Sequence, residues 1–348
     1  MGQLDPVAGL ARDGRPPRRA VDLSGFMFSG KSAVSDLLRE CDRVLVPNYR
    51  TEFDLLRIGG GLIDLENAVV DWSPIRTQSA LTRFERTVQR LAATPAFPAN
   101  LVTTGFGYAR QYPGILEGAR RFVDEIVDVA WSTPWPFDDL DDGPVATFTR
   151  KLRSRFGAAP RRSYRLVSAE RFPGAASAFV SSLLWQGADP SRYDLVVTHN
   201  ALEPFDPARH LHLLGPGARS IVVDRDPRDI YATAITTQVG FNDDLEFYRR
   251  IAGAHDVETF IRRHQAYRRA CAPANDRVLR LRFEDVALRY DETVARVLEF
   301  LELPSTAHVA RGSHLDPERT RANIGIWRAP ALAAYAADFA RIEAECGA

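Results

Sequence analysis

The sequence predicts an α/β fold with a central parallel sheet flanked by helices. Short apolar segments typical of buried strands recur at 20–24, 193–198, 218–224 and 277–283. Segments with helical spacing follow them, as at 291–301, where apolar side chains recur every three or four residues before Pro304. Strands that alternate with helices need crossover connections, and these make the sheet parallel and doubly wound.

We expect one folded domain over 20–348, preceded by a flexible tail at 1–19. The tail is rich in arginine and proline and lacks the apolar core of a signal peptide. Residues from about 50 to 185 show helical stretches at 81–91 and 118–130 between proline-rich turns. We interpret this region as a largely helical insertion that binds the acceptor substrate and forms a lid.

Composition excludes several classes of protein. Forty-five basic residues balance forty-five acidic ones, so no global positive field favours nucleic acid or an anionic membrane. No apolar run is long enough to span a bilayer. The three cysteines are far apart, which argues against a disulfide framework or a zinc site and fits a reducing cytoplasm. An anion site, if present, must be local.

The first candidate site is the loop Gly25–Ser32, which has the pattern G-x-x-x-x-G-K-S between a predicted strand and a predicted helix. Glycines let the backbone wrap around an anion, and a helix N-terminus adds unpaired N–H groups. Lys31 adds a full positive charge. This context predicts a phosphate-binding loop, although the pattern alone does not say which phosphate compound binds.

The second candidate site follows an apolar strand, in Arg225-Asp226-Pro227-Arg228-Asp229, with Thr233 eight residues beyond Arg225. The planar guanidinium of an arginine offers two parallel donors to a phosphate. For Arg228 and Asp229, an ion-pair cluster at the start of a helix explains the residues equally well.

These segments resemble the sulfotransferases that use 3′-phosphoadenosine 5′-phosphosulfate (PAPS). The family has R-[ND]-P-[RK]-D followed by a serine or threonine at the position of Thr233. The stretch 281–303 and the segment 321–328, with Gly325 and Trp327, are similar to further family motifs. The resemblance covers about 20–45 and 193–348, and the region between them is not recognised.

The resemblance implies a PAPS donor, the product 3′-phosphoadenosine 5′-phosphate (PAP) and no required metal. Arg225, Thr233 and Arg321 would bind the 3′-phosphate. The donor-binding set implied by the resemblance also includes Ser29, Gly30, Lys31, Ser32, Ala33 and Phe283. In the family a basic residue usually stands where this chain has Phe28, and Lys31 replaces a threonine. We infer that Lys31 supplies the missing charge.

His199 follows the strand 195–197 at the position where many sulfotransferases carry a catalytic histidine. An imidazole can take a proton from an attacking hydroxyl near neutral pH. Glu203 stays open as the alternative base because some family members use a carboxylate. The expected activity is transfer of a sulfuryl group to a hydroxyl of a small-molecule or carbohydrate acceptor.

Two alternatives remain open from the sequence. A P-loop kinase for a small molecule would use ATP and Mg²⁺, with Ser32 and Asp224 near the metal. A nucleotide-binding module without catalysis would show no turnover. The sequence does not identify the acceptor, and tryptophans such as Trp131 and Trp135 could line its pocket or pack in the core. The oligomeric state is not readable either.

Overall fold

The computed structural model describes residues 17–47, 52–70, 73–101, 103–135, 137, 142–157, 161–238, 244 and 246–347. Chain contacts divide it into two compact units. The first comprises 1–53, 187–212 and 216–348, and the second comprises 54–186 with 213–215. The second unit begins and ends within a few residues of the insertion expected at about 50–185. Its role as an acceptor lid stays a prediction, and most of the expected tail at 1–19 lies outside the described residues.

The first unit contains a parallel sheet in the order β2-β5-β1-β6-β7, which confirms the predicted fold class. Its strands are β1 (Arg19–Gly25), β2 (Val44–Leu45), β5 (Leu195–His199), β6 (Arg219–Asp224) and β7 (Val278–Arg282). All but the short β2 were predicted. Its helices are α1 (Lys31–Arg39), α9 (Pro227–Thr236), α10 (Phe247–Ile251), α11 (Val257–Ala270), α12 (Phe283–Leu288), α13 (Tyr290–Phe300), α14 (Pro317–Arg321) and α15 (Ala336–Cys346). Short 3₁₀ turns lie at η2 (Pro207–Leu214), η3 (Ser305–Ala307), η4 (Ile326–Arg328) and η5 (Pro330–Tyr335).

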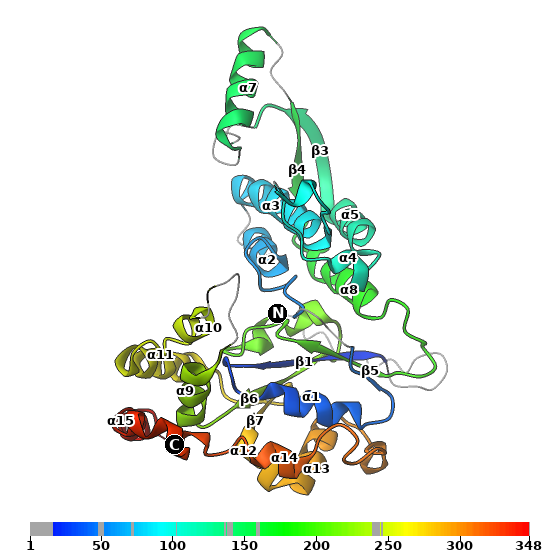
Figure 1. Ribbon diagram of the computed structural model, residues 1–348. Coiled ribbons are helices and arrows are strands. Elements are labelled where there is room, and N and C mark those ends of the chain that lie inside the picture. The colour runs from blue at the N-terminus through cyan, green and yellow to red at the C-terminus, as the bar shows by residue number, and fades with distance from the viewer. Residues whose placement is uncertain are drawn as a thin grey trace. The chain divides into compact units, whose positions relative to one another are not determined.

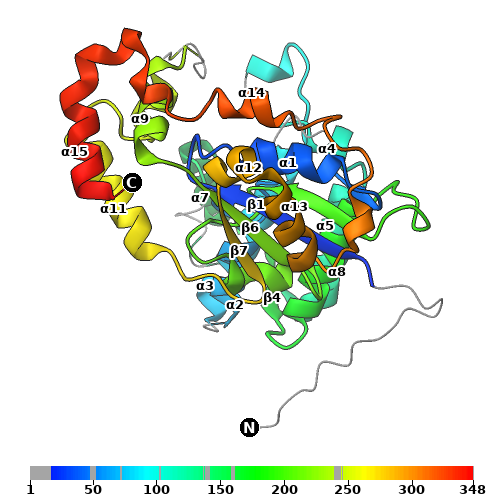
Figure 2. The same cartoon turned by 90° about the horizontal axis from the view of Figure 1, so that it is seen from below.

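The helices α1, α12 and α13 cover one face of this sheet (Figures 1 and 2). Val21 and Leu23 of β1 pack there with Val34 and Leu37 of α1 and with Val297 of α13. The alternation of side chains along a strand sends Asp22 and Ser24 to the opposite face, where both are buried. Burial on both faces fits the central position of β1 in the sheet.

The order of the strands places three candidate segments at one edge of the sheet. β1 pairs in parallel with β5 on one side and with β6 on the other. Their carboxyl ends therefore lie side by side, and each continues into a predicted site segment: the phosphate loop after Gly25, His199 at the end of β5, and Arg225 after β6. Ligands of open parallel sheets bind at such an edge.

The second unit is mainly helical and includes one antiparallel hairpin of β3 and β4. Its core is an aromatic cluster of Phe84, Phe122, Phe172 and Phe179. Its elements are α2 (Leu62–Val70), α3 (Pro74–Ala92), η1 (Ala99–Leu101), α4 (Tyr108–Gln111), α5 (Ile115–Ile126), β3 (Val127–Thr133), α7 (Pro144–Arg155), β4 (Arg162–Val167) and α8 (Phe172–Leu184).

Two predicted helices end or begin elsewhere in the structure. The helix expected at 118–130 ends at Ile126, because the chain from Val127 onward pairs with β4, a partner that is distant in sequence. The C-terminal helix expected at 331–342 begins with the 3₁₀ turn η5 and becomes α-helical only at Ala336. Within the part of the chain that the structure describes, no helix combines the length and hydrophobicity that a membrane crossing needs.

Candidate active site

The phosphate loop has a backbone that only glycine accommodates at two positions. Gly30 has φ +81°, in the left-handed region, and precedes the first residue of α1. A Cβ on Gly30 would lie 2.4 Å from the ring of Phe283, and one on Gly25 would lie 2.6 Å from the carbonyl oxygen of Val223. The hydroxyl of Ser29 is buried in this loop without a hydrogen-bond partner. A loop that holds a buried polar atom without a partner fits a bound anion or water.

Lys31, the first residue of α1, lies close to two side chains that the motif does not contain. Its Nζ is 3.1 Å from Oε1 of Glu52, and the side-chain amide of Asn200 donates a hydrogen bond to the same carboxylate oxygen. Glu52 thus joins the phosphate loop to the turn after β5. The pairing places the Lys31 ammonium near the end of the strand that carries His199.

His199 is held at the end of β5 by a buried carboxylate on the neighbouring strand. Asp22 accepts hydrogen bonds from the Thr198 hydroxyl at 2.8 Å and from the backbone N–H groups of Ala201 and Leu202. Nε2 of His199 lies 3.3 Å from Oγ of Ser35 on α1. Burial, together with the charges of Lys31 and Arg39, lowers the pKa of His199 to about 4. The imidazole is therefore neutral at pH 7 and able to accept a proton.

Arg225 is a partly buried cation whose hydrogen bonds go to neutral acceptors. Its guanidinium donates to the carbonyl oxygens of Phe28 at 3.0 Å and Asn323 at 2.6 Å, and to the Thr233 hydroxyl at 3.3 Å. Its Cζ lies 4.9 Å from the centre of the Phe283 ring, and its Nε is buried without a partner. Among the described residues no carboxylate comes within ion-pair distance of Arg225, and burial lowers its pKa.

Arg228 and Asp229 have structural roles. Arg228 pairs with Asp226 at 2.7 Å and with Glu343 at 2.7 Å, and it stacks on Trp327. The buried carboxylate of Asp229 accepts hydrogen bonds from the backbone N–H groups of Gly325 and Trp327. The ion-pair interpretation therefore holds for Arg228, whereas Asp229 binds backbone N–H groups. They fix the segment 323–328 against α9, and its Asn323 carbonyl in turn positions Arg225.

One cavity of about 490 Å³ brings most of the predicted site residues together. It lies within the first unit. Its lining comprises Phe26, Phe28, Ser29, Gly30, Lys31, Ser32, Ser35, Arg39, Pro47, Glu52, His199, Arg225 and Thr233. Phe283 packs against the loop and Arg225 from outside that lining.

Besides Phe283, three predicted residues do not line this cavity. The side chain of Ala33 packs in the core under the sheet. Arg321 is 3.5 Å from Glu318 on α14 and lines a different cavity with Tyr290 and Arg311. Glu203, the alternative base, is exposed. The donor-binding role of Arg321 stays a prediction.

Sequence reasoning missed three lining residues, Ser35, Arg39 and Glu52. Ser35 and Arg39 follow Lys31 at intervals of four, so helical spacing from the motif could have found them. Glu52 gives no such signal, because its position depends on how the chain returns to the sheet after β2.

Asp224, which a kinase would use to hold Mg²⁺, is held by other groups. Its carboxylate accepts a hydrogen bond from the Tyr267 hydroxyl at 3.1 Å and pairs with Arg268 at 3.3 Å and Arg280 at 3.7 Å. Two cations and a hydroxyl already surround it. This geometry does not favour Asp224 as a metal ligand.

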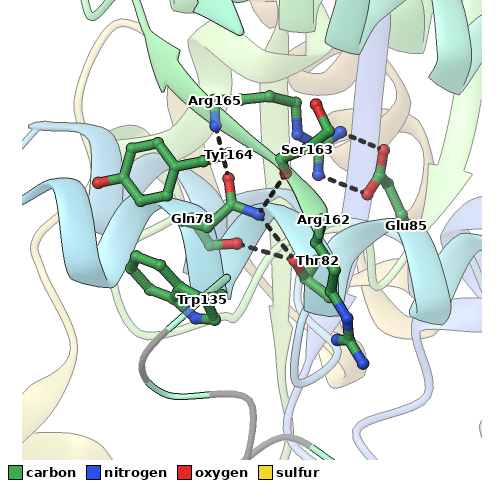
Figure 3. Close-up of a pocket in the computed structure, with 8 residues that line it drawn as sticks. All are labelled: Gln78, Thr82, Glu85, Trp135, Arg162, Ser163, Tyr164 and Arg165. Atoms are coloured by element: carbon green, nitrogen blue, oxygen red, sulfur yellow. Dashed lines mark hydrogen bonds and ion pairs between the residues drawn. The ribbon is translucent and has the colours of Figure 1, made fainter. Parts of the chain in front are cut away.

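A second cavity, of about 300 Å³, lies within the second unit (Figure 3). Gln78 of α3 accepts a hydrogen bond from the backbone N–H of Arg165, whose guanidinium pairs with Glu85. The indole N–H of Trp135 is buried without a partner, and its ring packs on Tyr164. Trp135 thus lines a cavity, as the acceptor hypothesis expects, while Trp131 packs on the same tyrosine from β3. The acceptor role stays a prediction.

The first unit therefore presents an α/β fold with a glycine-containing loop at a helix N-terminus and a neutral imidazole in one cavity. Residues 143–307 match the model of the sulfotransferase family, which confirms the recognition made from the sequence. The matched segment includes His199, Arg225 and Phe283, whereas Lys31 precedes it. The match supports an enzyme of sulfotransfer and does not favour a kinase.

Several solved structures are similar at low identity. The sulfotransferase domain from the olefin synthase of Synechococcus PCC 7002 is 15% identical, with 94% of this chain and 93% of that chain covered and a TM-score of 0.40. The sulfotransferase domain from the curacin biosynthetic pathway is 11% identical, with 95% and 97% covered and a TM-score of 0.39. TM-scores this low carry no conclusion about the site. A comparison with curated proteins gives no match.

Proposed function

We propose that the protein transfers a sulfuryl group from PAPS to a hydroxyl of a small-molecule or carbohydrate acceptor and releases PAP. The observation that carries this proposal is Arg225. A cation that is partly withdrawn from solvent and has no carboxylate partner is favourably compensated by a bound anion. Arg225 lies in the same cavity as the phosphate loop, beside Thr233, so the cavity offers two separate positions for anionic groups.

The two positions fit the two ends of PAP. The N-terminus of α1, the buried Ser29 hydroxyl and Lys31 would hold the 5′-phosphate, since a helix N-terminus and an ammonium both favour anions. Arg225 and Thr233 would hold the 3′-phosphate, a group that ATP and AMP lack. The same cavity would hold PAPS.

His199 would accept the proton of the acceptor hydroxyl as its oxygen forms a bond to sulfur. The bond from sulfur to the bridging oxygen of the 5′-phosphate breaks in the same step, and Lys31 offers positive charge to that oxygen as it becomes anionic. The two products are a sulfate ester and PAP. The proton ends on His199 and then passes to solvent.

The low pKa of His199 has a physical consequence for this role. A base works best when its pKa lies near the operating pH, and a pKa of about 4 makes the imidazole a weak base. Two of the groups that lower the pKa are the cations Lys31 and Arg39. Anionic phosphates bound beside them would raise the pKa of His199 toward neutrality. Donor binding would thereby activate the base.

The proposal is tested first by ligand stabilisation. A ligand of the folded state raises the melting temperature, so PAP without Mg²⁺ should stabilise the protein, and AMP should stabilise it much less. Strong stabilisation by ATP with Mg²⁺ and none by PAP would make the donor assignment wrong. Transfer of radiolabelled sulfate from PAPS to a panel of phenols, sugars and aliphatic alcohols then tests catalysis.

A further inference from the structure

The helix α7 connects the two strands of the hairpin in the second unit and has an unusual distribution of side chains. It lies between β3 and β4 in the chain, beyond one end of these strands (Figure 1). None of its twelve residues is buried. Its large apolar residues are exposed: Val145 is 77% exposed, Phe148 67% and Leu152 46%, and Phe156 at its C-terminus is 78% exposed.

These four side chains form one apolar stripe. At about 100° per residue, positions 145, 148, 152 and 156 fall within an arc of roughly 80°. On a helix of a globular protein such a stripe normally faces the core. Here it faces solvent.

The opposite face of α7 is held by an ion pair. Arg150 lies on the side of the helix away from the stripe, and its Nε is 3.6 Å from Oδ2 of Asp142. The Asp142 side chain, only 6% exposed, also pairs with Arg162 of β4 and Arg86 of α3. These arginines hold the pKa of Asp142 below its usual range. The polar face of the helix is thus turned toward its own unit, and the apolar face is turned outward.

The charge of α7 complements an anionic surface. The segment 144–155 contains Arg150, Lys151, Arg153 and Arg155 and no acidic residue, although the whole chain is neutral. Lys151 and Arg155 flank the stripe on one side, and Arg153 flanks it on the other. Long basic side chains on both flanks of an apolar stripe are typical of helices that lie in the surface of a bilayer.

We propose that α7 docks the protein on a membrane surface that carries anionic lipids. The stripe would enter the boundary between headgroups and acyl chains, and the flanking cations would lie among the lipid phosphates. A protein partner fits less well, because four side chains on a helix about 18 Å long cover far less than the roughly 800 Å² that each partner gives to a stable interface. The proposal does not depend on the donor or the acceptor of the active site.

Flotation of the full chain with vesicles tests the proposal. We expect binding to vesicles of phosphatidylcholine and phosphatidylglycerol in a two to one ratio, and much weaker binding to phosphatidylcholine alone. Raised salt should weaken the binding because it screens the charges. The double variant Phe148→Ser/Phe156→Ser should lose the binding. Its control, Phe97→Ser, removes a side chain that is equally exposed in another segment of the same unit.

A second pair of variants tests the charge. Arg153→Gln with Arg155→Gln should lower the partition coefficient about fivefold per residue, whereas Arg120→Gln with Arg121→Gln, which change two exposed arginines of α5, should leave it unchanged. Absence of binding to the anionic vesicles overturns the proposal. It is also overturned if Phe97→Ser loses as much vesicle binding as Phe148→Ser/Phe156→Ser. A dimer in solution that Phe148→Ser/Phe156→Ser converts to a monomer, without vesicle binding, would assign the stripe to a second copy of the chain instead.

Discussion

We expect the change Arg225→Ala to remove most of the preference of the protein for PAP over AMP. The two nucleotides differ only in the 3′-phosphate, so the ratio of their affinities reports on one binding position. In the structure the guanidinium lies between the carbonyl oxygens of Phe28 and Asn323 and touches the Thr233 hydroxyl. Alanine leaves the phosphate loop with Lys31 in place.

The magnitude follows from the hydrogen bonds that a buried guanidinium makes to a phosphate. A hydrogen bond to a charged group contributes about 1.5–3 kcal/mol, which corresponds to a loss of about 10- to 100-fold in PAP affinity. AMP affinity should change little. The fold should survive, because the lost hydrogen bonds to two carbonyl groups are offset by removing a partly buried cation that has no ion-pair partner among the described residues.

Isothermal titration of each variant with PAP and AMP measures both affinities. Arg225→Lys should recover part of the loss, since an ammonium keeps the charge but not the two-pronged geometry. Thr233→Ala should reduce the ratio of PAP affinity to AMP affinity by less than Arg225→Ala does. Arg282→Ala is the matched control, because this nearby arginine is exposed and pairs with Glu284 outside the cavity. Equal losses of PAP and AMP affinity in Arg225→Ala would refute the assignment of the 3′-phosphate position.

Three further predictions concern the loop and the base. Lys31→Ala should weaken both PAP and AMP by titration, because the ammonium serves the 5′-phosphate that they share; an unchanged AMP affinity would contradict this. His199→Ala should slow turnover about 10²- to 10⁴-fold with PAP affinity retained. The same variant should lose less stability than the wild type on acidification from pH 6.5 toward 4, because in this range the unfolded imidazole binds a proton and the folded one does not. Identical pH profiles of melting temperature for variant and wild type would argue against the lowered pKa of His199. Gly30→Ala should lower the free energy of unfolding by at least about 1–2 kcal/mol, since φ is +81° and the new Cβ would meet Phe283, whereas Gly59→Ala, with open space around its Cβ, should not.

Much of the fold could be predicted because its signals are local. The strand, loop and helix around Lys31 follow from an apolar strand, glycines that permit the loop and helical spacing after it. The strands at 195–199, 219–224 and 278–282 follow from short buried apolar runs. The order of the strands then brought Lys31, His199 and Arg225 to one edge, as a parallel sheet requires.

Other features depended on contacts between residues far apart in the chain. Glu52 reaches Lys31 only through the path that the chain takes after β2, and the strand at 127–133 forms because β4 is available to pair with it. No local sequence pattern distinguishes Glu52 from a residue of an ordinary loop, or the strand at 127–133 from the continuation of a helix. Arg321 was nominated by a motif match, and the structure places it beside Glu318; its donor-binding role stays a prediction.

The sequence by itself determined the main strands of the sheet, the phosphate loop and the arginine that follows β6. These features depend on backbone conformation and on neighbours within a few residues. Only the tertiary structure decided the pKa values of the site residues and which face of α7 is exposed. The lowered pKa values of His199 and Arg225 arise first from burial, which is a property of the packed chain. The outward stripe of α7 is likewise invisible in the sequence, where the same spacing predicts a buried face. The ion pair of Arg150 with Asp142 holds the opposite side of the helix against its own unit.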